Sequence, residues 1–430
     1  MNVLMFGWEF PPNISGGLGT ACYGLTKSLS SLANVDITFV IPKVHGNEIE
    51  NSIQLRGANQ LDLLKSKIRP ERLMLPVECF SIESGLVPYA NPEEYQKQAP
   101  ASVEEIGIKS DQQIVSQINF TGNYGPNLFN EIHNFSVVAE HLARQTKFDL
   151  IHAHDWLTFP SGILAKKVSG KPLVIHVHAT DFDRSGGKAN PKVYQIEKEG
   201  MDEADCIICV SNRTREMVIE KYDISPSKIS TVHNGVEFDE PVTDPERLKR
   251  NREKIVTFLG RITLQKGPEY FIRVAEMVLE KMDHVRFIMA GSGDLLHEMI
   301  KKAARAGLGN KFLFTGFLKG KDVHRMLRLS DVFVMPSVSE PFGICPLEAM
   351  QCGVPTIISK QSGVSEVVKH AIKVDFWDVQ AMADAIHGIL SYPALFNMMK
   401  KEGKKEVTGI CWEQAAQKIE GLYRQLLLSA

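Results

Sequence analysis

Apolar runs of strand length alternate with amphipathic helical stretches along most of this chain, and this alternation constrains the fold more than any other feature. In the first half the predicted strands lie at residues 3–6, 36–41, 150–154, 173–177, 206–210 and 229–232. In the second half they lie at residues 255–259, 285–290, 312–315, 332–335 and 356–358. Helical segments stand between them, so the pattern predicts parallel sheets with helices on both faces.

A polar and charged segment, residues 243–254, interrupts this alternation near the middle of the chain. Such a segment is typical of a linker between domains. The length of 430 residues also favours two or more domains, because single hydrophobic cores stop growing at about 250–300 residues. We therefore predict an α/β fold with two Rossmann-like, doubly wound domains that face a cleft, at residues 1–242 and 243–411.

The overall charge and hydropathy bear on the kind of partner that we expect. With 49 basic and 51 acidic residues the net charge is −2, so we expect no nucleic-acid partner and no polybasic membrane anchor. No apolar run approaches the roughly 18–20 residues of a membrane span, so we expect no stable membrane insertion. Residues 1–10 are apolar but lack a basic leader and run into two prolines, which predicts a first strand and not a signal peptide.

The seven cysteines are scattered along the chain. An odd, dispersed set predicts reduced thiols and a cytoplasmic location. Cys206 and Cys209 have the C-x-x-C spacing of metal and redox sites, but they lie within an apolar strand pattern, without a second such pair. We assign them a buried structural role.

Two glutamates, Glu340 and Glu348, lie in a segment that first forms a Pro/Gly turn and then an apolar helix, which Gly353 ends. This arrangement directs a carboxylate and the N–H groups of a helix N-terminus toward one cleft. Carboxylates accept hydrogen bonds from hydroxyls, and a helix N-terminus attracts phosphate. The segment therefore favours a polyhydroxy ligand that carries phosphate.

A second loop carries two cations at a predicted strand end. Arg261 and Lys266 stand five positions apart, after a strand and before a helix that begins at Pro268. Arg presents a fork and Lys a point charge, so both side chains can reach one diphosphate. A solvated pair of surface cations is the alternative. The strand-end position favours the functional interpretation, because ligands of doubly wound folds bind at the carboxyl ends of the strands.

Glycine-rich turns follow other predicted strands. Residues 15–19 read Ser-Gly-Gly-Leu-Gly, and the helix after them favours an anion or a negatively polarised oxygen near Gly16 and Gly17. The spacing differs from G-x-G-x-x-G, so a nicotinamide cofactor is disfavoured. Two turns in the second half could form a nucleotide-base pocket, and a purely structural role is the alternative for each turn. Their candidate residues are Gly291, Gly293 and Phe317.

Histidines stand at two strand ends of the first half, as His152 and His154 and as His176 and His178. We expect no metal site there, because residues i and i+2 share one face of a strand and cannot all converge with the second strand. Most such histidines are packed or hydrogen-bonded instead. His178 and the neighbouring Asp155 are better candidates for holding sugar hydroxyls or for hydrogen bonding near a reacting carbon.

Together these motifs resemble the retaining glycosyltransferases with two Rossmann-like domains, family 4, and their glycogen and starch synthase relatives. The most specific combination is Gly-Arg261-x-x-x-x-Lys266-Gly with the Glu340 and Glu348 pair, and the resemblance covers nearly the whole chain. The glycine loop and the two histidine segments look like glycogen synthase segments, although Ile14 stands where those enzymes have a lysine.

The resemblance implies the GT-B fold and a C-terminal helix, residues 412–430, that packs back on the N-terminal domain. In this family the N-terminal domain shapes the acceptor site, and here it includes a polar insertion at about residues 45–127. The insertion contains aromatic residues that either stack on sugar rings or pack onto their own domain. These residues include Tyr89, Tyr95, Phe120 and Tyr124.

The resemblance also implies a role for each matched residue. Arg261 and Lys266 would hold the donor diphosphate and stabilise the leaving nucleotide, while Glu348 would accept hydrogen bonds from the ribose. Glu340 would contact the transferred sugar, and His178 would lie beside the anomeric centre. The other substrate contacts would come from Gly16, Gly17, Asp155, Gly343, Ile344 and Cys345. Enzymes of this type retain the anomeric configuration and need no metal or other cofactor.

We therefore predict a hexosyltransferase that moves glucose from ADP-glucose or UDP-glucose to the end of an α-1,4-glucan. A family 4 enzyme that makes sucrose phosphate, a surface polysaccharide or a glycolipid is the alternative. A retaining glycosidase is disfavoured. Its two carboxylates would have to flank one bond about 5–5.5 Å apart, whereas Glu348 stands two helical turns beyond Glu340. A non-catalytic sugar-binding protein would not need Arg261 and Lys266 at a strand end. A sugar epimerase is disfavoured by the glycine loop and by His178.

Overall fold

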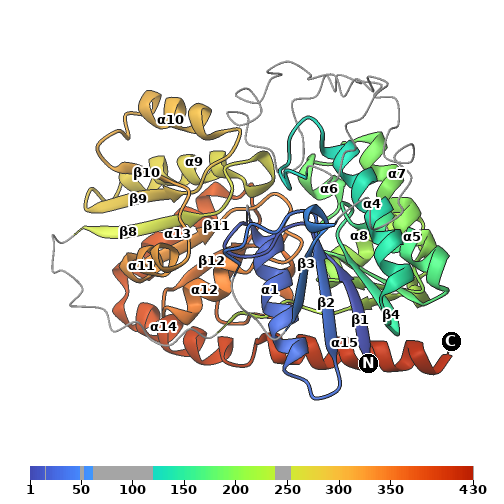
Figure 1. Ribbon diagram of the computed structural model, residues 1–430. Helices are drawn as coiled ribbons and strands as arrows, with labels where there is room; N and C mark the ends of the chain where they lie inside the picture. The colour runs from blue at the N-terminus through green and yellow to red at the C-terminus, as the bar shows by residue number, and fades with distance from the viewer. Residues whose placement is uncertain (15, 49–52, 62–119, 238–252, 430) are drawn as a thin grey trace, which may run out of the picture.

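The structure is a computed structural model, and it describes residues 1–14, 16–48, 53–61, 120–237 and 253–429. Figure 1 shows two α/β halves side by side, each with its strands in the middle and its helices outside. The prediction of two Rossmann-like domains is confirmed by two separate parallel sheets. Most of the predicted linker and most of the predicted insertion lie outside the described residues.

The first sheet has the strand order β3-β2-β1-β4-β5-β6-β7, and neighbouring strands pair in parallel. The order reverses between β1 and β4, which is where doubly wound sheets bind their ligands. The bounds are β1 Asn2–Phe6, β2 Asp36–Ile41, β3 Gln54–Gly57, β4 Leu150–His154, β5 Leu173–Val177, β6 Cys206–Cys209 and β7 Ile229–Thr231.

Helices cover both faces of this sheet. Local sequence fixes two helix starts, because the side chains of Asn190 and Ser211 accept hydrogen bonds from backbone N–H groups of the first turn. The bounds are α1 Gly17–Ser30, α4 Leu128–Gln145, α5 Phe159–Ser169, α6 Asp181–Arg184, α7 Pro191–Glu203 and α8 Asn212–Tyr222. A short 3-10 turn, Ala58–Gln60, follows β3, and a second, Pro226–Lys228, precedes β7.

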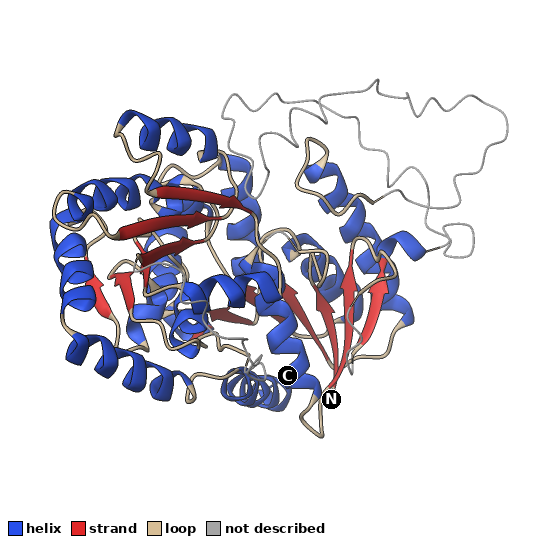
Figure 2. Ribbon diagram, turned by 90° about the vertical axis from the view of Figure 1, so that its left-hand side faces the viewer, coloured by secondary structure: helices blue, strands red, loops and turns tan. Residues whose placement is uncertain are grey.

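The second sheet has the order β10-β9-β8-β11-β12-β13, again with parallel neighbours. Figure 2 shows helices around the strands of this half as well. The strands are β8 Lys254–Leu259, β9 Val285–Ala290, β10 Phe312–Gly316, β11 Val332–Met335, β12 Thr356–Ser359 and β13 Ile372–Val374. The helices are α9 Pro268–Leu279, α10 Leu296–Arg305, α11 Lys321–Leu329, α12 Cys345–Gln351, α13 Val379–Ser391, α14 Pro393–Val407 and α15 Trp412–Ser429. Two 3-10 turns, η4 Leu264–Lys266 and η5 Gly363–Glu366, lie in loops that follow β8 and β12.

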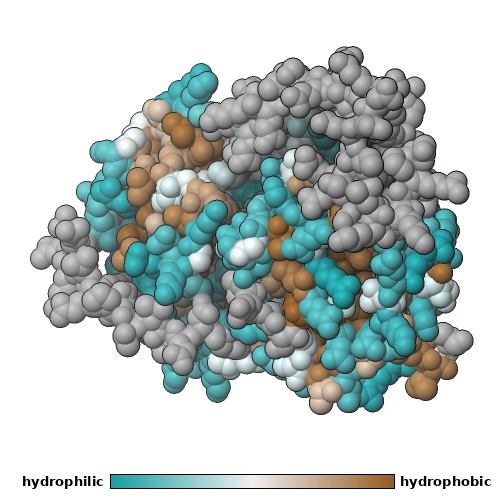
Figure 3. Space-filling view, in the orientation of Figure 1, coloured by the Kyte–Doolittle hydropathy of each residue, from teal (hydrophilic) through white to brown (hydrophobic). Residues whose placement is uncertain are grey.

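Strand β1 explains why apolar runs mark the sheets so clearly. Leu4 and Phe6 join the apolar cluster under α4 and α5, while Val3 and Met5 join the cluster under α1 and α15. Successive side chains of a strand point to opposite faces, and both faces are covered here. A strand buried on both faces therefore reads as a continuous apolar run. On the outer surface, Figure 3 shows hydrophilic residues interspersed with small apolar patches.

Helix α15 packs against α1 of the first domain, although it follows the second domain in the sequence. The indole of Trp412 lies against Gly24, where an added Cβ would collide with the ring. The hydroxyl of Tyr423 forms a hydrogen bond with His152 Nδ1 on β4. Contacts with α1 and β4 thus fix the last helix on one face of the first sheet.

The structure contains elements that the sequence analysis did not identify. These are β3, α6, β13 and α14, all near polar or charged stretches with a weak apolar period. It also decides between the two interpretations of the described aromatic residues of the insertion. Phe120 and Tyr124 are buried in the core of the first domain, where Phe120 makes an edge contact with Phe135. Tyr89 and Tyr95 lie outside the described residues.

Candidate active site

Three loops at the carboxyl end of the second sheet bind one another through their backbones. Gly260 N–H donates to Ala290 O at 3.0 Å, and Ile262 N–H donates to Ser292 O at 2.8 Å. Gly291 N–H donates to Gly316 O at 2.9 Å. The loops after β8, β9 and β10 therefore form one rim, and this rim fixes the backbone on either side of Arg261.

Gly291 and Gly293 have a structural reason to be glycine. Gly291 has φ +143°, and a Cβ there would collide with the carbonyl oxygen of Gly260; a Cβ at Gly293 would collide with that of Ile262. Close packing of two backbones requires glycine at such positions. Phe317 lies on the same rim and is 46% exposed. Contact of these residues with a nucleotide base stays a prediction.

Lys266 and Glu340, predicted as separate site residues, form an ion pair. Lys266 Nζ lies 2.5 Å from Glu340 Oε2, and Ser337 Oγ donates to the same oxygen at 3.3 Å. The Lys266 side chain keeps 22% of its surface exposed, whereas that of Glu340 keeps 7%. The lysine has three N–H donors, so its pairing with Glu340 leaves capacity for a second anion.

Glu340 is held in place by the neighbouring loop after β12. Its backbone N–H donates to Gln361 O at 3.0 Å, and its carbonyl accepts from Gly363 N–H at 2.9 Å. Gly343 follows with φ +96°, and a Cβ there would lie 3.0 Å from Glu340 Cγ. The turn thus brings the Glu340 carboxylate directly beside the chain segment that enters α12.

Helix α12 begins immediately after this turn. Glu348 lies in its first turn, and Ile344 is its N-cap. Backbone N–H groups in the first turn of a helix lack an acceptor within the helix, so they point outward as donors. Burial, followed by the Glu348 carboxylate, raises the pKa of the Cys345 thiol, so this cysteine is a protonated, packed side chain. Contacts of Gly343, Ile344, Cys345 and Glu348 with substrate stay predictions.

The glycine loop of the first domain approaches this rim from the other side. Gly16 precedes α1, and a Cβ there would lie 3.8 Å from Arg261 Cδ. Gly17 is exposed, with open space around its Cα. Gly19 N–H donates to the buried carboxylate of Glu9 at 3.1 Å, which anchors the loop. The structure therefore brings the glycine loop and Arg261, distant in the sequence, next to each other.

Asp155 is fully buried and has φ +62°, a left-handed conformation that a non-glycine residue seldom adopts. Its Oδ2 pairs with the Arg184 guanidinium at 2.6 Å, and its Oδ1 accepts from the N–H groups of His178 at 3.2 Å and Ala179 at 3.3 Å. Both carboxylate oxygens are thus engaged within the protein. Asp155 fixes the loop that carries His178, and a direct contact with sugar hydroxyls would have to compete with these bonds.

Arg184 bridges Asp155 to a second buried carboxylate that the sequence analysis did not select. Its Nη1 lies 3.2 Å from Glu197 Oε1, and the Tyr222 hydroxyl donates to the other oxygen of Glu197. Burial raises the pKa of Glu197 to about 8, against the lowering effect of Arg184. Glu197 has no sequence signal that marks it as a site residue, because it lies on a helix among ordinary polar residues.

The expectation that the four histidines cannot converge was wrong. In the register of the two strands His154 stands beside His176, so i and i+2 of both strands share one face. The imidazole rings stack, with centroids 4.3 Å apart for His152–His154 and for His176–His178, and 5.3 Å apart for His154–His176. The alternation within one strand does not show this, because parallel pairing aligns the side chains of the two strands.

Burial keeps this histidine stack neutral. It lowers the pKa of His178 to about 4, opposed by the Asp155 carboxylate, and that of His152 to about 3. His154 and His176 are lowered in pKa for the same reason. His178 Nε2 lies 3.0 Å from His154 Nδ1, and this pair shares a hydrogen bond. His178 is therefore an uncharged imidazole, and unlike the other three it is only partly buried.

Polar contacts join the two domains beside Glu340. Ser339 Oγ donates to Asp183 Oδ1 at 2.6 Å, and Arg213 Nη2 donates to Ser339 Oγ at 3.2 Å. Leu264, on the Lys266 turn, approaches Gly186 of the first domain. The loop after His178 in one domain and the Glu340 loop of the other thus meet along one boundary.

Two family models match the chain in succession. The model described as Glycosyltransferase Family 4 matches residues 99–240, and that described as Glycosyl transferases group 1 matches residues 239–406. The chain is a glycosyltransferase of the family 4 type. Its relatives include an uncharacterized glycosyltransferase of Methanocaldococcus jannaschii, which is 27% identical over 443 residues that cover 99% of this chain and 98% of that protein.

Solved structures agree with a GT-B fold for this glycosyltransferase. A sucrose-phosphate synthase from Thermosynechococcus elongatus is similar with a TM-score of 0.71 at 19% identity, over 100% of both chains. Anabaena HepE in complex with UDP and glucose is similar with a TM-score of 0.67 at 17% identity, over 99% of this chain and 100% of that one. Among the residues that the structure describes, none of the helices combines the length and apolarity that a bilayer crossing requires.

Proposed function

We propose that this glycosyltransferase moves glucose from ADP-glucose or UDP-glucose to the end of an α-1,4-glucan, retains the anomeric configuration and requires no metal ion. The observation that carries this proposal is the contact between Lys266 and Glu340, on the second domain's rim. A cation for the diphosphate stands there beside an acceptor for sugar hydroxyls. This combination suits a nucleotide sugar better than it suits a free sugar or a free nucleotide.

Arg261 and Lys266 bind the donor diphosphate in this proposal. Both lie on the loop after β8, and the three-loop rim fixes the backbone around Arg261. Gly343 and Ile344, which lead into α12, and Cys345, its first residue, add backbone N–H donors. Glu348 accepts hydrogen bonds from the ribose hydroxyls, Gly291, Gly293 and Phe317 border the base, and Gly16 and Gly17 close over the donor from the first domain.

Catalysis follows from the charge that develops as the glycosidic C–O bond breaks. Positive charge collects on the sugar ring in an oxocarbenium-like state, and negative charge collects on the leaving diphosphate. Cations fixed at the diphosphate stabilise that state more than the ground state, which lowers the barrier. The Lys266–Glu340 pair contacts two parts of the donor in this proposal. The lysine binds the diphosphate, and the carboxylate faces the transferred sugar.

His178 acts beside the anomeric centre as a neutral hydrogen-bonding group in this proposal. A protonated imidazole would repel the positive charge that develops on the sugar. Burial lowers the pKa of His178 to about 4, so the ring stays uncharged near neutral pH. Asp155 is a positioning residue, since it binds the backbone N–H groups of His178 and Ala179.

The α-glucan acceptor is supported by the glycogen-synthase-like glycine loop and histidine segments. A second candidate, transfer to a small phosphorylated sugar, is favoured by a different observation. The similar sucrose-phosphate synthase matches this chain from end to end, so the overall build fits that kind of product as well. Both candidates share the donor site and differ only in the acceptor.

A nucleotide-release assay across a panel of sugar nucleotides tests the proposal. Each donor is offered alone, with glycogen or maltooligosaccharide, and with hexose phosphates. We expect glucose nucleotides to release nucleotide only with acceptor and the glucan chain to grow. If the glucan does not grow with ADP-glucose or with UDP-glucose, the glucan acceptor is wrong. If nucleotide is released with hexose phosphates and not with glucans, the result favours the second candidate. The anomeric proton coupling of the product tests retention.

A further inference from the structure

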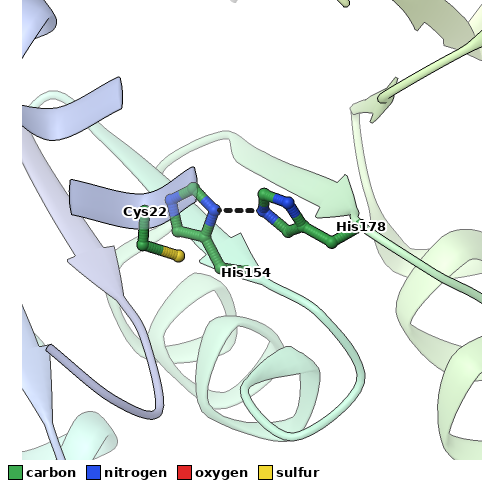
Figure 4. Close-up of side chains that lie close together, drawn as sticks. All are labelled: Cys22, His154 and His178. Carbon is green, nitrogen blue, oxygen red and sulfur yellow. Dashed lines mark hydrogen bonds between the residues drawn. The ribbon is translucent and has the colours of Figure 1, made fainter. Parts of the chain in front are cut away.

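A cluster of side chains of the kinds that bind metal ions lies beside the proposed reaction centre, at the carboxyl end of the first sheet. Cys22 of α1, His154 at the end of β4 and His178 after β5 each offer a ligand atom, and these atoms lie within 4.8 Å of one another. Figure 4 shows the Cys22 sulfur beside the His154 ring, with the ring nitrogens of His154 and His178 facing each other. We propose that Cys22, His154 and His178 form an inhibitory Zn²⁺ site.

The donor set selects the metal. A thiolate and two imidazoles are the ligands that Zn²⁺ prefers, whereas Mg²⁺ and Ca²⁺ require oxygen ligands. The two nitrogens already point at each other, since His154 Nδ1 lies 3.0 Å from His178 Nε2. Tetrahedral Zn²⁺ with bonds of about 2.0–2.1 Å to nitrogen needs these atoms about 3.4 Å apart. The rings must therefore separate by about 0.4 Å and tilt until both lone pairs point at the ion.

The other histidine group, His152, His154 and His176, fits a metal ion less well. His152 and His176 stack with an angle of 8° between their rings, and His152 and His154 with an angle of 25°. A metal ion binds in the plane of each imidazole, and stacked rings have parallel planes that do not meet at one point. His152 Nδ1 is also bound to the Tyr423 hydroxyl. The geometry therefore favours the group that contains Cys22.

The tautomer of each imidazole decides whether its ligand nitrogen presents a lone pair to the proposed ion. His154 is fully buried, and its Nε2 has no hydrogen-bond partner. Neutral His154 presents a lone pair on Nδ1 when its proton sits on Nε2, and neutral His178 presents one on Nε2 when its proton sits on Nδ1. Both imidazoles keep one proton each, and the Cys22 thiol loses its proton to solvent as the Zn–S bond forms. Zn²⁺ binding thus releases one proton.

Access and inhibition follow from the position of His178. Cys22 and His154 are buried, whereas His178 is partly exposed, so the ion enters from the side of His178 and its fourth position holds water. The inhibitory effect rests on the proposed function: a bound Zn²⁺ occupies the His178 lone pair and places positive charge beside the sugar that becomes positive in the transition state. Both effects oppose transfer.

Zn²⁺ binding to the full-length chain, without substrate, tests the site itself. Competition with a chromophoric chelator should give one Zn²⁺ per chain with a Kd below about 1 µM, and Cys22→Ser should weaken it by about 10-fold or more. Co²⁺ should show a thiolate charge-transfer band that Cys22→Ser abolishes. Cys209→Ser removes an equally buried thiol outside the cluster and should leave both readouts unchanged.

Absence of stoichiometric Zn²⁺ binding, or equal binding by wild type and Cys22→Ser, would overturn the site. So would binding that His152→Gln abolishes and Cys22→Ser does not, which would assign the ion to the stacked histidines. In the second experiment, Zn²⁺ should slow nucleotide release by wild type at least about 10-fold, and a chelator should restore the rate. The Cys22→Ser variant should not be inhibited by the same Zn²⁺ concentration. Zn²⁺ binding without inhibition would overturn the inhibitory role alone. Because the binding arm uses no donor, its result stands even if the proposed function fails.

Discussion

The carboxyl ends of the two sheets differ in how they hold charge. On the first sheet Arg184 and Asp155 are buried and paired with each other, and the histidines beside them are neutral. On the second sheet Lys266 is partly exposed and Arg261 lies on a rim of close-packed backbone. The first edge is desolvated, whereas the second keeps charge accessible to a ligand. This difference supports the proposal that the second edge binds the diphosphate.

The largest effect should come from the buried network of the first edge. Arg184→Leu leaves the buried Asp155 carboxylate without its cation, and loss of one partner of a buried ion pair costs about 3–5 kcal/mol. Urea unfolding should show this loss near neutral pH. Arg325→Leu, which removes an arginine with a 73% exposed side chain, should change the free energy of unfolding by less than about 0.5 kcal/mol. Equal effects of the two variants would remove the contrast between buried and exposed charge.

The partly exposed cations of the second edge should affect turnover more than stability. Arg261→Ala and Lys266→Ala should each lower kcat by about 10²-fold or more, because each removes charge stabilisation that the transition state requires. Steady-state kinetics with the active donor measures this. The unfolding midpoint should stay near wild type for Arg261→Ala and should fall for Lys266→Ala, because that variant leaves the Glu340 carboxylate, only 7% exposed, without its partner. Lys301→Ala, an exposed lysine on α10, serves as the control. Near-normal turnover in either variant would contradict the assignment of the diphosphate to this edge.

The rim that supports Arg261 should depend on its glycine. Gly291→Ala introduces a Cβ into the Gly260 carbonyl at φ +143°, which should cost about 2 kcal/mol or more and displace Arg261. Thermal unfolding and donor binding measure the two consequences. Gly309→Ala adds the same methyl group where nothing lies within 4 Å and should be nearly neutral. A neutral Gly291→Ala would show that the rim is more compliant than its packing indicates.

The smallest effect concerns the pH dependence of the first edge. The pKa of His178 is lowered to about 4 and that of His152 to about 3, below the value of about 6.5 in an unfolded chain. Between these values the unfolded chain binds protons that the folded chain excludes, so stability is complete above about pH 6.5 and falls as the pH drops toward 4. The raised pKa of Glu197 acts in the opposite sense, since the folded chain holds its proton up to about pH 8.

Urea unfolding at about pH 7 and about pH 5 measures this dependence. His176→Asn should reduce the difference between the two free energies, because it removes one of the neutral buried rings. His284→Asn, at a half-exposed position, should leave the difference unchanged. An identical slope in wild type and His176→Asn would show that the stack does not govern the pH response.

The apolar runs were enough to predict two parallel α/β sheets, because a strand buried on both faces must be continuously apolar. The motifs were enough to predict the family, since loops at the carboxyl ends of parallel strands meet at one edge. The apolar pattern is weaker in elements that bury only one face or few residues. For this reason β3, α6, β13 and α14 were not predicted from the sequence.

Other features arose only in the tertiary structure. The pairing of Lys266 with Glu340, the bridge from Asp155 through Arg184 to Glu197, and the approach of Cys22 to His154 join residues whose separation in the chain carries no periodic signal. The histidine stack depended on the register of β4 against β5, which single-strand alternation does not specify. Sequence determined which residue types stand at each strand end. Strand register and domain contact decided which of them touch, because side-chain proximity across a sheet is set by backbone pairing and not by order along the chain.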